Sequence, residues 1–112
     1  MAKIDLKDFV KYGKLFEVYG NLLSEDRQSV MTMYFDFNMT LVEIAKEKDV
    51  SRQAVLDSIE KSCQKLESFE KVLHLVQREK QLSEKLQELK SQAEKLGQDK
   101  IAEKVGDILK EI

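Results

Sequence analysis

Apolar residues recur every three or four positions along most of this chain, a spacing that predicts amphipathic helices. In the first such segment, about Leu6 to Leu23, the repeated positions are mainly aromatic, and they are Phe9, Tyr12, Phe16, Tyr19 and Leu23. A stripe of this kind could be a stacking surface, but large apolar residues at helical spacing are far more often core. We therefore interpret it as the buried face of a first helix.

Two short helices are predicted next, each introduced by a residue that favours helix N-termini. Ser24, followed at once by two acidic residues, predicts a second helix that runs to about Phe35. Thr40, with Glu43 three residues later, has the capping-box pattern, in which each side chain bonds the other residue's backbone. It predicts a third helix over about 41–48.

The segment that follows has the features of a helix-turn-helix. Asp49 occupies the turn, where the backbone often takes a positive φ that Asp tolerates, and Ser51 would cap the next helix. Ala45 is small where two helices would cross closely, and we expect Val50 and Val55 to fill the angle between them. This order of residues predicts a helix-turn-helix whose recognition helix starts directly after the Ser51 cap.

The recognition helix is predicted to be long, because no helix breaker occurs between position 52 and Gly97. Gly97 is a plausible stop, and a last amphipathic helix is expected from about Asp99. We therefore divide the chain into a helix-turn-helix domain, residues 1–76, with the recognition helix starting near 52, and a C-terminal helical arm, residues 77–112.

Apolar residues in the arm recur with heptad spacing. At about 78–81 this repeat is out of phase with the apolar repeat of the preceding helix. The two apolar seams of the arm need a partner: they could fold against each other as a hairpin across Gly97, or pair with a second copy of the chain. Because two heptads alone are marginal in water, we favour a homodimer. The expected dimerisation residues are Leu82, Leu86, Leu89, Leu96, Ile101, Val105 and Ile108.

Composition agrees with an all-α fold. The 112 residues include no proline and four glycines, and strands and tight turns usually need such breakers. Asp5 and Asp8 interrupt the apolar core that a signal peptide would need, and no apolar run reaches the roughly 18 residues of a membrane span. The sequence therefore predicts a cytoplasmic protein with no membrane contact.

Enzymatic chemistry is not indicated. The sequence has no glycine-rich phosphate loop, no paired Cys or His ligands and no nucleophile beside a candidate base. Cys63, the only cysteine, lies at helical spacing from Ile59 and Leu66, which indicates a small core residue. His74 lies in an apolar run and indicates a partly packed surface residue. We expect no catalytic residue, no metal and no cofactor.

The exposed side of the recognition helix is the candidate functional surface. If this helix enters a major groove, its N-terminal residues meet bases first, so that an arginine could bond guanine and a glutamine adenine. The net charge of −2 without a basic stripe counts against strong DNA binding, and Asp57 and Glu60 would repel phosphates. The candidate nucleic-acid-binding residues are Ser51, Arg52, Gln53, Leu56, Lys61 and Lys65.

The segment TLVEIAKEKDVSRQAVLDSIEK resembles the YlxM-like helix-turn-helix proteins of Gram-positive bacteria and mollicutes. It is more distantly similar to the promoter-reading region four of sigma factors. LFEVYGNLLSEDRQSVMTMYF and KLESFEKVLHL agree with the same family, so the resemblance covers about Leu15 to Leu75. It implies an all-α, sigma-region-four-like helix-turn-helix domain with a long C-terminal helical extension. It also implies a regulatory role linked to the signal recognition particle pathway, because genes of the family commonly neighbour that of the particle's GTPase.

Two functions therefore remain open. The first is a regulatory protein that binds DNA through its recognition helix. The second is a protein-interaction module that does not bind DNA and acts on the signal recognition particle or its GTPase. The acidic balance of the chain, with Asp57 and Glu60 on the exposed side, favours the second.

Overall fold

The computed structural model describes residues 6–112, and over these residues the chain forms helices and no strand, which confirms the predicted all-α fold. Asp5, one of the two acidic residues that argue against a signal peptide, lies outside the described residues. No helix in the described range is both long and apolar enough to cross a bilayer. The elements are α1 (Leu6–Tyr19), the 3-10 turn η1 (Gly20–Leu22), α2 (Glu25–Phe35), α3 (Leu41–Lys48), α4 (Arg52–Leu73), α5 (Leu75–Lys95) and α6 (Asp99–Lys110).

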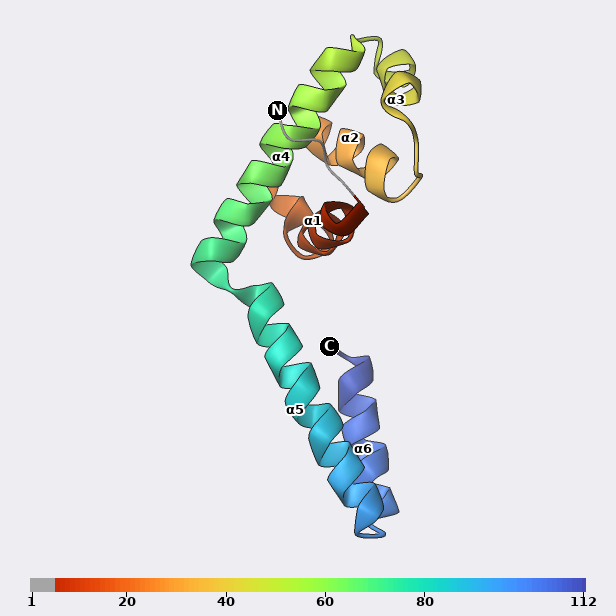
Figure 1. The fold of residues 1–112 in the computed structure, drawn as a ribbon, viewed down its shortest axis with the longest axis vertical. Helices are drawn as coiled ribbons and strands as arrows, with labels where there is room; N and C mark the ends of the chain where they lie inside the picture. Colours follow the sequence, from red (N-terminus) through yellow and green to blue (C-terminus); the bar gives the residue numbers. More distant parts are fainter. Residues whose placement is uncertain (1–5) are drawn as a thin grey trace. The chain divides into compact units, whose positions relative to one another are not determined.

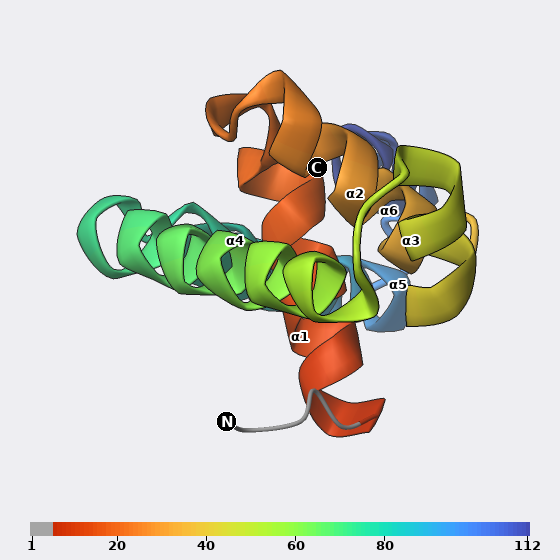
Figure 2. The same ribbon diagram turned by 90° about the horizontal axis from the view of Figure 1, so that it is seen from above.

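The first compact unit ends at His74. In Figure 1, α1, α2 and α3 all lie on one side of α4, and the turned view in Figure 2 shows α1 crossing α4 steeply. The core lies between these helices, and its least exposed large side chains are each at most 1 % accessible. They are Tyr19, Met31, Ile44, Val55, Ile59 and Leu66.

The aromatic stripe of α1 is core, as predicted. The Phe9 ring lies 4.8 Å from that of Phe35 and 5.6 Å from that of Tyr34, so the stripe packs on the end of α2. The α-helix ends at Tyr19 instead of continuing to the predicted position 23, because the chain tightens into η1 at Gly20. A Cβ on Gly20 would lie 2.8 Å from the Phe16 ring, so this close turn requires glycine.

The prediction of one unbroken helix from position 52 to Gly97 is wrong. α4 ends at Leu73, and His74 takes the left-handed conformation (φ 55°, ψ 27°) while its N–H donates to the Glu70 carbonyl (2.8 Å). Histidine is one of the few non-glycine residues enriched in this region of φ/ψ space. The spacing of apolar residues does not reveal a single left-handed residue among good helix formers. The only change in that spacing, at 78–81, lies a few residues after the break.

The second compact unit, residues 75–112, is a hairpin of α5 and α6, which lie side by side in Figure 1. Gly97, at φ 73°, makes the turn, and α6 begins at Asp99, so both predicted positions are confirmed. The buried residues of this unit are Ala93, Ala102 and Val105. Of the two predicted arrangements of the arm, the structure thus contains the fold-back across Gly97.

Candidate nucleic-acid interface

Caps on both sides hold the turn between α3 and α4. The Thr40 N–H donates to Glu43 Oε1 (2.9 Å), and the Glu43 N–H donates to Thr40 Oγ1 (3.1 Å). The hydrogen bond from the Thr40 N–H also lowers the pKa of the Glu43 carboxyl. Asp49 ends α3 at φ 55°, and Ser51 accepts from the Ala54 N–H (3.0 Å) at the start of α4. The capping box, the left-handed Asp49 and the Ser51 cap are therefore confirmed.

Apolar residues bury the inner side of this turn. Ile44 is fully buried, Val55 is 1 % exposed and Ala45 is 8 % exposed. The prediction that Val50 fills the same angle is wrong, because 47 % of its surface is exposed. The Val50 N–H donates to the Ala45 carbonyl (3.0 Å) as the chain reverses at Asp49, and this reversal leaves the Val50 side chain on the outer side of the turn.

The first turn of α4 presents polar side chains to solvent. Ser51, Arg52 and Gln53 are exposed, and in the described part of the chain Arg52 forms no ion pair. The Gln53 Nε2 donates to Asp57 Oδ1 (3.0 Å), so this amide is engaged within the helix. Leu56, in the next turn, is partly buried. The α4 tip, residues 51–53, thus offers an exposed guanidinium and the N–H groups of a helix N-terminus.

Farther along α4, the two predicted lysines line a shallow groove of about 320 Å³ between α2 and α4. This α2–α4 groove is lined by Arg27, Lys61, Gln64, Lys65 and Ser68. Sequence reasoning missed Arg27, because it comes from α2 and nothing in the local pattern indicates which part of α4 that helix approaches. The i, i+3 and i, i+4 spacing of the other four residues on one helix is the signal that could have indicated their shared side.

Carboxylates on another side of α4 hold α1 in place. Glu67 Oε1 accepts hydrogen bonds from Lys11 Nζ and from the Tyr12 hydroxyl, both at 2.7 Å, and the Tyr19 hydroxyl donates to Glu70. The bond from Lys11, and then that from Tyr12, lowers the pKa of Glu67, while the carboxylate raises the pKa of Tyr12. This α1–α4 seam orients the recognition helix without lining the α2–α4 groove.

A family model described as "Putative helix-turn-helix protein, YlxM / p13 like" matches residues 6–108. The chain belongs to this family, UPF0122. It is 36% identical over 98 residues to a UPF0122 protein of Fusobacterium nucleatum, a match that covers 88% of this chain and 95% of the relative. A UPF0122 protein of Halalkalibacterium halodurans is 42% identical over 81 residues (72% and 74%), and one of Latilactobacillus sakei is 34% identical over 108 residues (95% and 96%).

The match confirms the YlxM-like family identified from the sequence and extends it. The resemblance seen in the sequence stops near Leu75, whereas the family model continues to residue 108. The α5–α6 hairpin is therefore part of what UPF0122 proteins share with this chain, and the helix-turn-helix is not an isolated module followed by an unrelated arm.

The reactive side chains of this UPF0122 protein lie apart from the α4 tip. Cys63 is 4 % exposed, and burial raises the pKa of its thiol to about 12, which agrees with the predicted core position. His74 is exposed and ends α4. Within residues 6–112, no group of three or more His, Cys, Asp and Glu side chains is placed to hold a metal ion.

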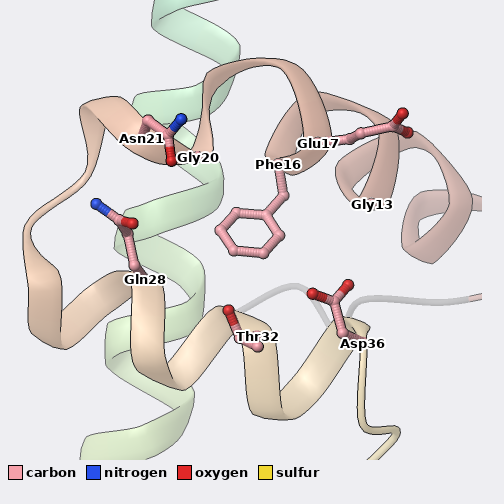
Figure 3. Close-up of a pocket in the computed structure, with 8 residues that line it drawn as sticks. All are labelled: Gly13, Phe16, Glu17, Gly20, Asn21, Gln28, Thr32 and Asp36. Carbon is pink, nitrogen blue, oxygen red and sulfur yellow. The ribbon is translucent and has the colours of Figure 1, made fainter.

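A second hollow, of about 420 Å³, lies between α2 and the end of α1 with η1. Figure 3 shows the Phe16 ring pointing into the space between the two segments, with Thr32 and Asp36 on the opposite side. The Gln28 Nε2 donates to the Leu23 carbonyl (2.8 Å), which braces the connection between η1 and α2. The lining residues are Gly13, Phe16, Glu17, Gly20, Asn21, Gln28, Thr32 and Asp36, and none of them is a predicted site residue.

The hairpin uses only part of the predicted dimerisation set. Val105 is 4 % exposed and Leu86 is partly buried, so these two contribute to the contact between α5 and α6. The other five residues remain between 47 % and 76 % exposed, and they are Leu82, Leu89, Leu96, Ile101 and Ile108.

Proposed function

We propose that this UPF0122 protein is a cytoplasmic regulatory protein that binds duplex DNA through the α4 tip. The observation that supports this best is the exposed first turn of α4, held in place by the left-handed Asp49 and the Ser51 cap. In helix-turn-helix proteins the residues at this position enter the major groove, while the preceding helix crosses the backbone. A rigid turn matters here because base readout requires donors at fixed positions.

The side chains of the tip suit specific base contacts. An arginine such as Arg52 can bond O6 and N7 of guanine together, and Gln53 can bond adenine once its amide leaves Asp57. Leu56 can contact a thymine methyl group, and the Ser51 end of α4 can receive a phosphate at the helix N-terminus. Lys61 and Lys65 would contact backbone phosphates rather than bases.

Arg52→Glu tests this proposal, with Lys71→Glu as the matched control, because both change the charge equally and Lys71 is exposed near the far end of α4. We expect Arg52→Glu to weaken binding to the preferred duplex by about tenfold or more, and Lys71→Glu to change it much less. Fluorescence anisotropy of labelled duplexes, first selected from a random pool, measures both. Equal effects of the two variants would contradict base readout by the tip, and wild-type binding that does not change with salt would contradict DNA binding altogether.

A second candidate function is favoured by the Gln53–Asp57 hydrogen bond and by Glu60 on the same helix. A glutamine held by a carboxylate, with further negative charge nearby, suits a protein surface better than a phosphate backbone. In this alternative the protein does not bind DNA and acts on the signal recognition particle or its GTPase, as the resemblance to the YlxM-like family implies. Fold alone does not decide between the two functions.

Capture from a bacterial lysate with tagged protein, with and without nuclease, separates the two candidates. Recovery of the particle's GTPase after nuclease treatment would support the interaction module. Recovery of DNA fragments, lost on nuclease treatment, would support the DNA-binding regulator. Asp57→Asn distinguishes them further, because it removes a negative charge and should strengthen DNA binding but weaken a contact with a basic protein surface.

A homodimer formed through the hairpin is part of the same proposal. The exposed leucine and isoleucine side chains on α5 and α6 support it, because apolar side chains that recur at heptad spacing and stay exposed are typical of a helix face that pairs with another helix. A dimer would carry two recognition helices, and binding of both to one duplex would raise the affinity of a slightly acidic domain.

A further inference from the structure

The α2–α4 groove gathers three cations, and none of them forms an ion pair within the part of the chain that the structure describes. Other lysines of the same unit are paired: Lys11 Nζ lies 2.7 Å from Glu67, and Lys48 Nζ lies 2.8 Å from Asp26. Asp26 directly precedes Arg27, so the carboxylate nearest to Arg27 along the chain already has a partner on α3. The groove therefore concentrates uncompensated positive charge in a chain whose net charge is −2.

The lining of the groove has the donor groups that a phosphate accepts from. Arg27 supplies a guanidinium from α2, and Lys61 and Lys65 supply two ammonium groups from α4. Gln64 and Ser68 add an amide and a hydroxyl, which are common phosphate donors in complexes with nucleic acids. Among the described residues that line the groove, none carries a carboxylate. Because the cations come from two helices, a phosphate in the groove would be contacted from both walls.

We propose that the α2–α4 groove is a phosphate-binding site that holds the backbone of the duplex DNA whose bases the α4 tip reads. This inference rests on the proposed DNA-binding function. Lys61 lies about 14 Å along the helix axis from Arg52, at a rise of about 1.5 Å per residue. At about 3.6 residues per turn these nine positions also place Lys61 on the side of α4 opposite to Arg52. A helix in the major groove, which is about 12 Å wide, has one backbone strand on each side, so the α2–α4 groove would face one of these strands while the tip contacts the bases between them.

The two surfaces then have separate roles. The α4 tip determines which sequence is preferred, and the α2–α4 groove determines how strongly any duplex is held and how steeply that affinity falls with salt. This division explains how a chain without a basic stripe in its sequence can still contact DNA, because the positive surface is assembled from two helices.

The test compares Arg27→Gln/Lys61→Gln/Lys65→Gln with the control Lys71→Gln/Lys80→Gln/Lys100→Gln in the full chain. Both triple variants remove three positive charges, and the control lysines are exposed and lie outside the groove. Affinity for the preferred duplex and for an unrelated duplex is measured by anisotropy from about 50 to 200 mM salt. We expect the groove variant to lose about tenfold or more in affinity for both duplexes, and to flatten the slope of log K against log salt by about 2 to 3.

A single variant, Lys65→Gln, provides a milder test and should flatten the salt slope by about 1. Circular dichroism of each variant verifies that the helices remain. If the groove triple variant and its control behave alike while Arg52→Glu weakens binding, the groove inference is overturned and the proposed function stands. If Arg52→Glu has no effect while the groove variant weakens binding, the groove inference stands and base readout by the tip fails. No duplex binding by the wild type at low salt would overturn both.

Discussion

The longest helices of the two units are similar in length, α4 with 22 residues and α5 with 21, but the units bury very different side chains. In the N-terminal unit Met31, Ile44 and Leu66 are fully buried, whereas the hairpin of residues 75–112 buries two alanines and Val105. Complete burial of a leucine or methionine stabilises a fold by about 1.5 to 3 kcal/mol, and an alanine contributes far less. The comparison teaches that the helix-turn-helix carries its own core, while the hairpin leaves much of its apolar surface exposed.

The largest expected effect comes from opening a cavity in the core of the N-terminal unit. Leu66→Ala should lower the free energy of unfolding by about 2 to 5 kcal/mol, because Leu66 is fully buried between α4 and its neighbours. Leu22→Ala in η1, where 58 % of the side chain is exposed, should change it by about 0.5 kcal/mol or less. Urea denaturation followed by circular dichroism measures both, and similar losses would show that this core is not the source of stability.

The next effect tests whether the apolar surface of the hairpin pairs two copies of the chain. Leu89→Glu/Ile108→Glu places charge at two half-exposed apolar positions and should weaken dimerisation by about 2 to 4 kcal/mol. Gln87→Glu/Ser91→Glu adds the same charge at exposed polar positions of α5 and should leave the dimer intact. Sedimentation at several concentrations gives the mass of each variant. A wild type that is monomeric at all of them would contradict the proposed dimer.

Local sequence signals explain which helix ends could be predicted from the sequence and which could not. Where local chemistry and packing agree, as at Thr40, Asp49 and Ser51, sequence reasoning located the helix ends correctly. At His74 no cap, glycine or proline marks the break, so the helix was predicted to continue. Val50 shows the same limit, because an apolar residue next to a turn is buried or exposed according to the exact path of the chain.

A smaller effect on stability is expected from removing a helix N-cap, because α3 in the N-terminal unit has a side-chain cap and α6 in the hairpin has none. Thr40 and Glu43 form a reciprocal pair, whereas Gln98, before α6, makes no side-chain cap. Thr40→Ala should lower the free energy of unfolding by about 1 kcal/mol, and Gln98→Ala by much less. Thermal melting of the two variants gives the comparison. A larger loss from Gln98→Ala would mean that the start of α6 depends on contacts other than its cap.

The candidate interface shows where prediction from sequence ends. The α4 tip follows from one continuous segment, so Ser51, Arg52 and Gln53 could be named without a structure. The α2–α4 groove could not, because Arg27 joins Lys61 and Lys65 only through the packing of α2 against α4. Tyr12 and Glu67 are 55 positions apart in sequence, and their hydrogen bond follows from the angle at which α1 crosses α4.

The smallest expected effect is a pH dependence that the α1–α4 seam gives to the N-terminal unit. Hydrogen bonds from Lys11 and then Tyr12 lower the pKa of Glu67 in the folded state. The seam therefore stabilises the fold above the ordinary glutamate pKa of about 4.3, and this contribution is lost as the pH falls through the lower folded pKa. Because the Lys11 and Glu67 side chains are 56 % and 41 % exposed, solvent screening limits it to less than about 1 kcal/mol.

Glu67→Gln isolates this contribution, because it keeps the shape of the side chain and removes its titration. Wild type should lose slightly more stability than Glu67→Gln between about pH 5 and pH 3, and the two should differ most near neutral pH. Glu17→Gln, on the exposed face of α1, serves as the control for the loss of one negative charge. Urea midpoints across this pH range measure the difference. Parallel curves for wild type and Glu67→Gln would mean that the ionised Glu67 carboxylate adds nothing to the contact between α1 and α4.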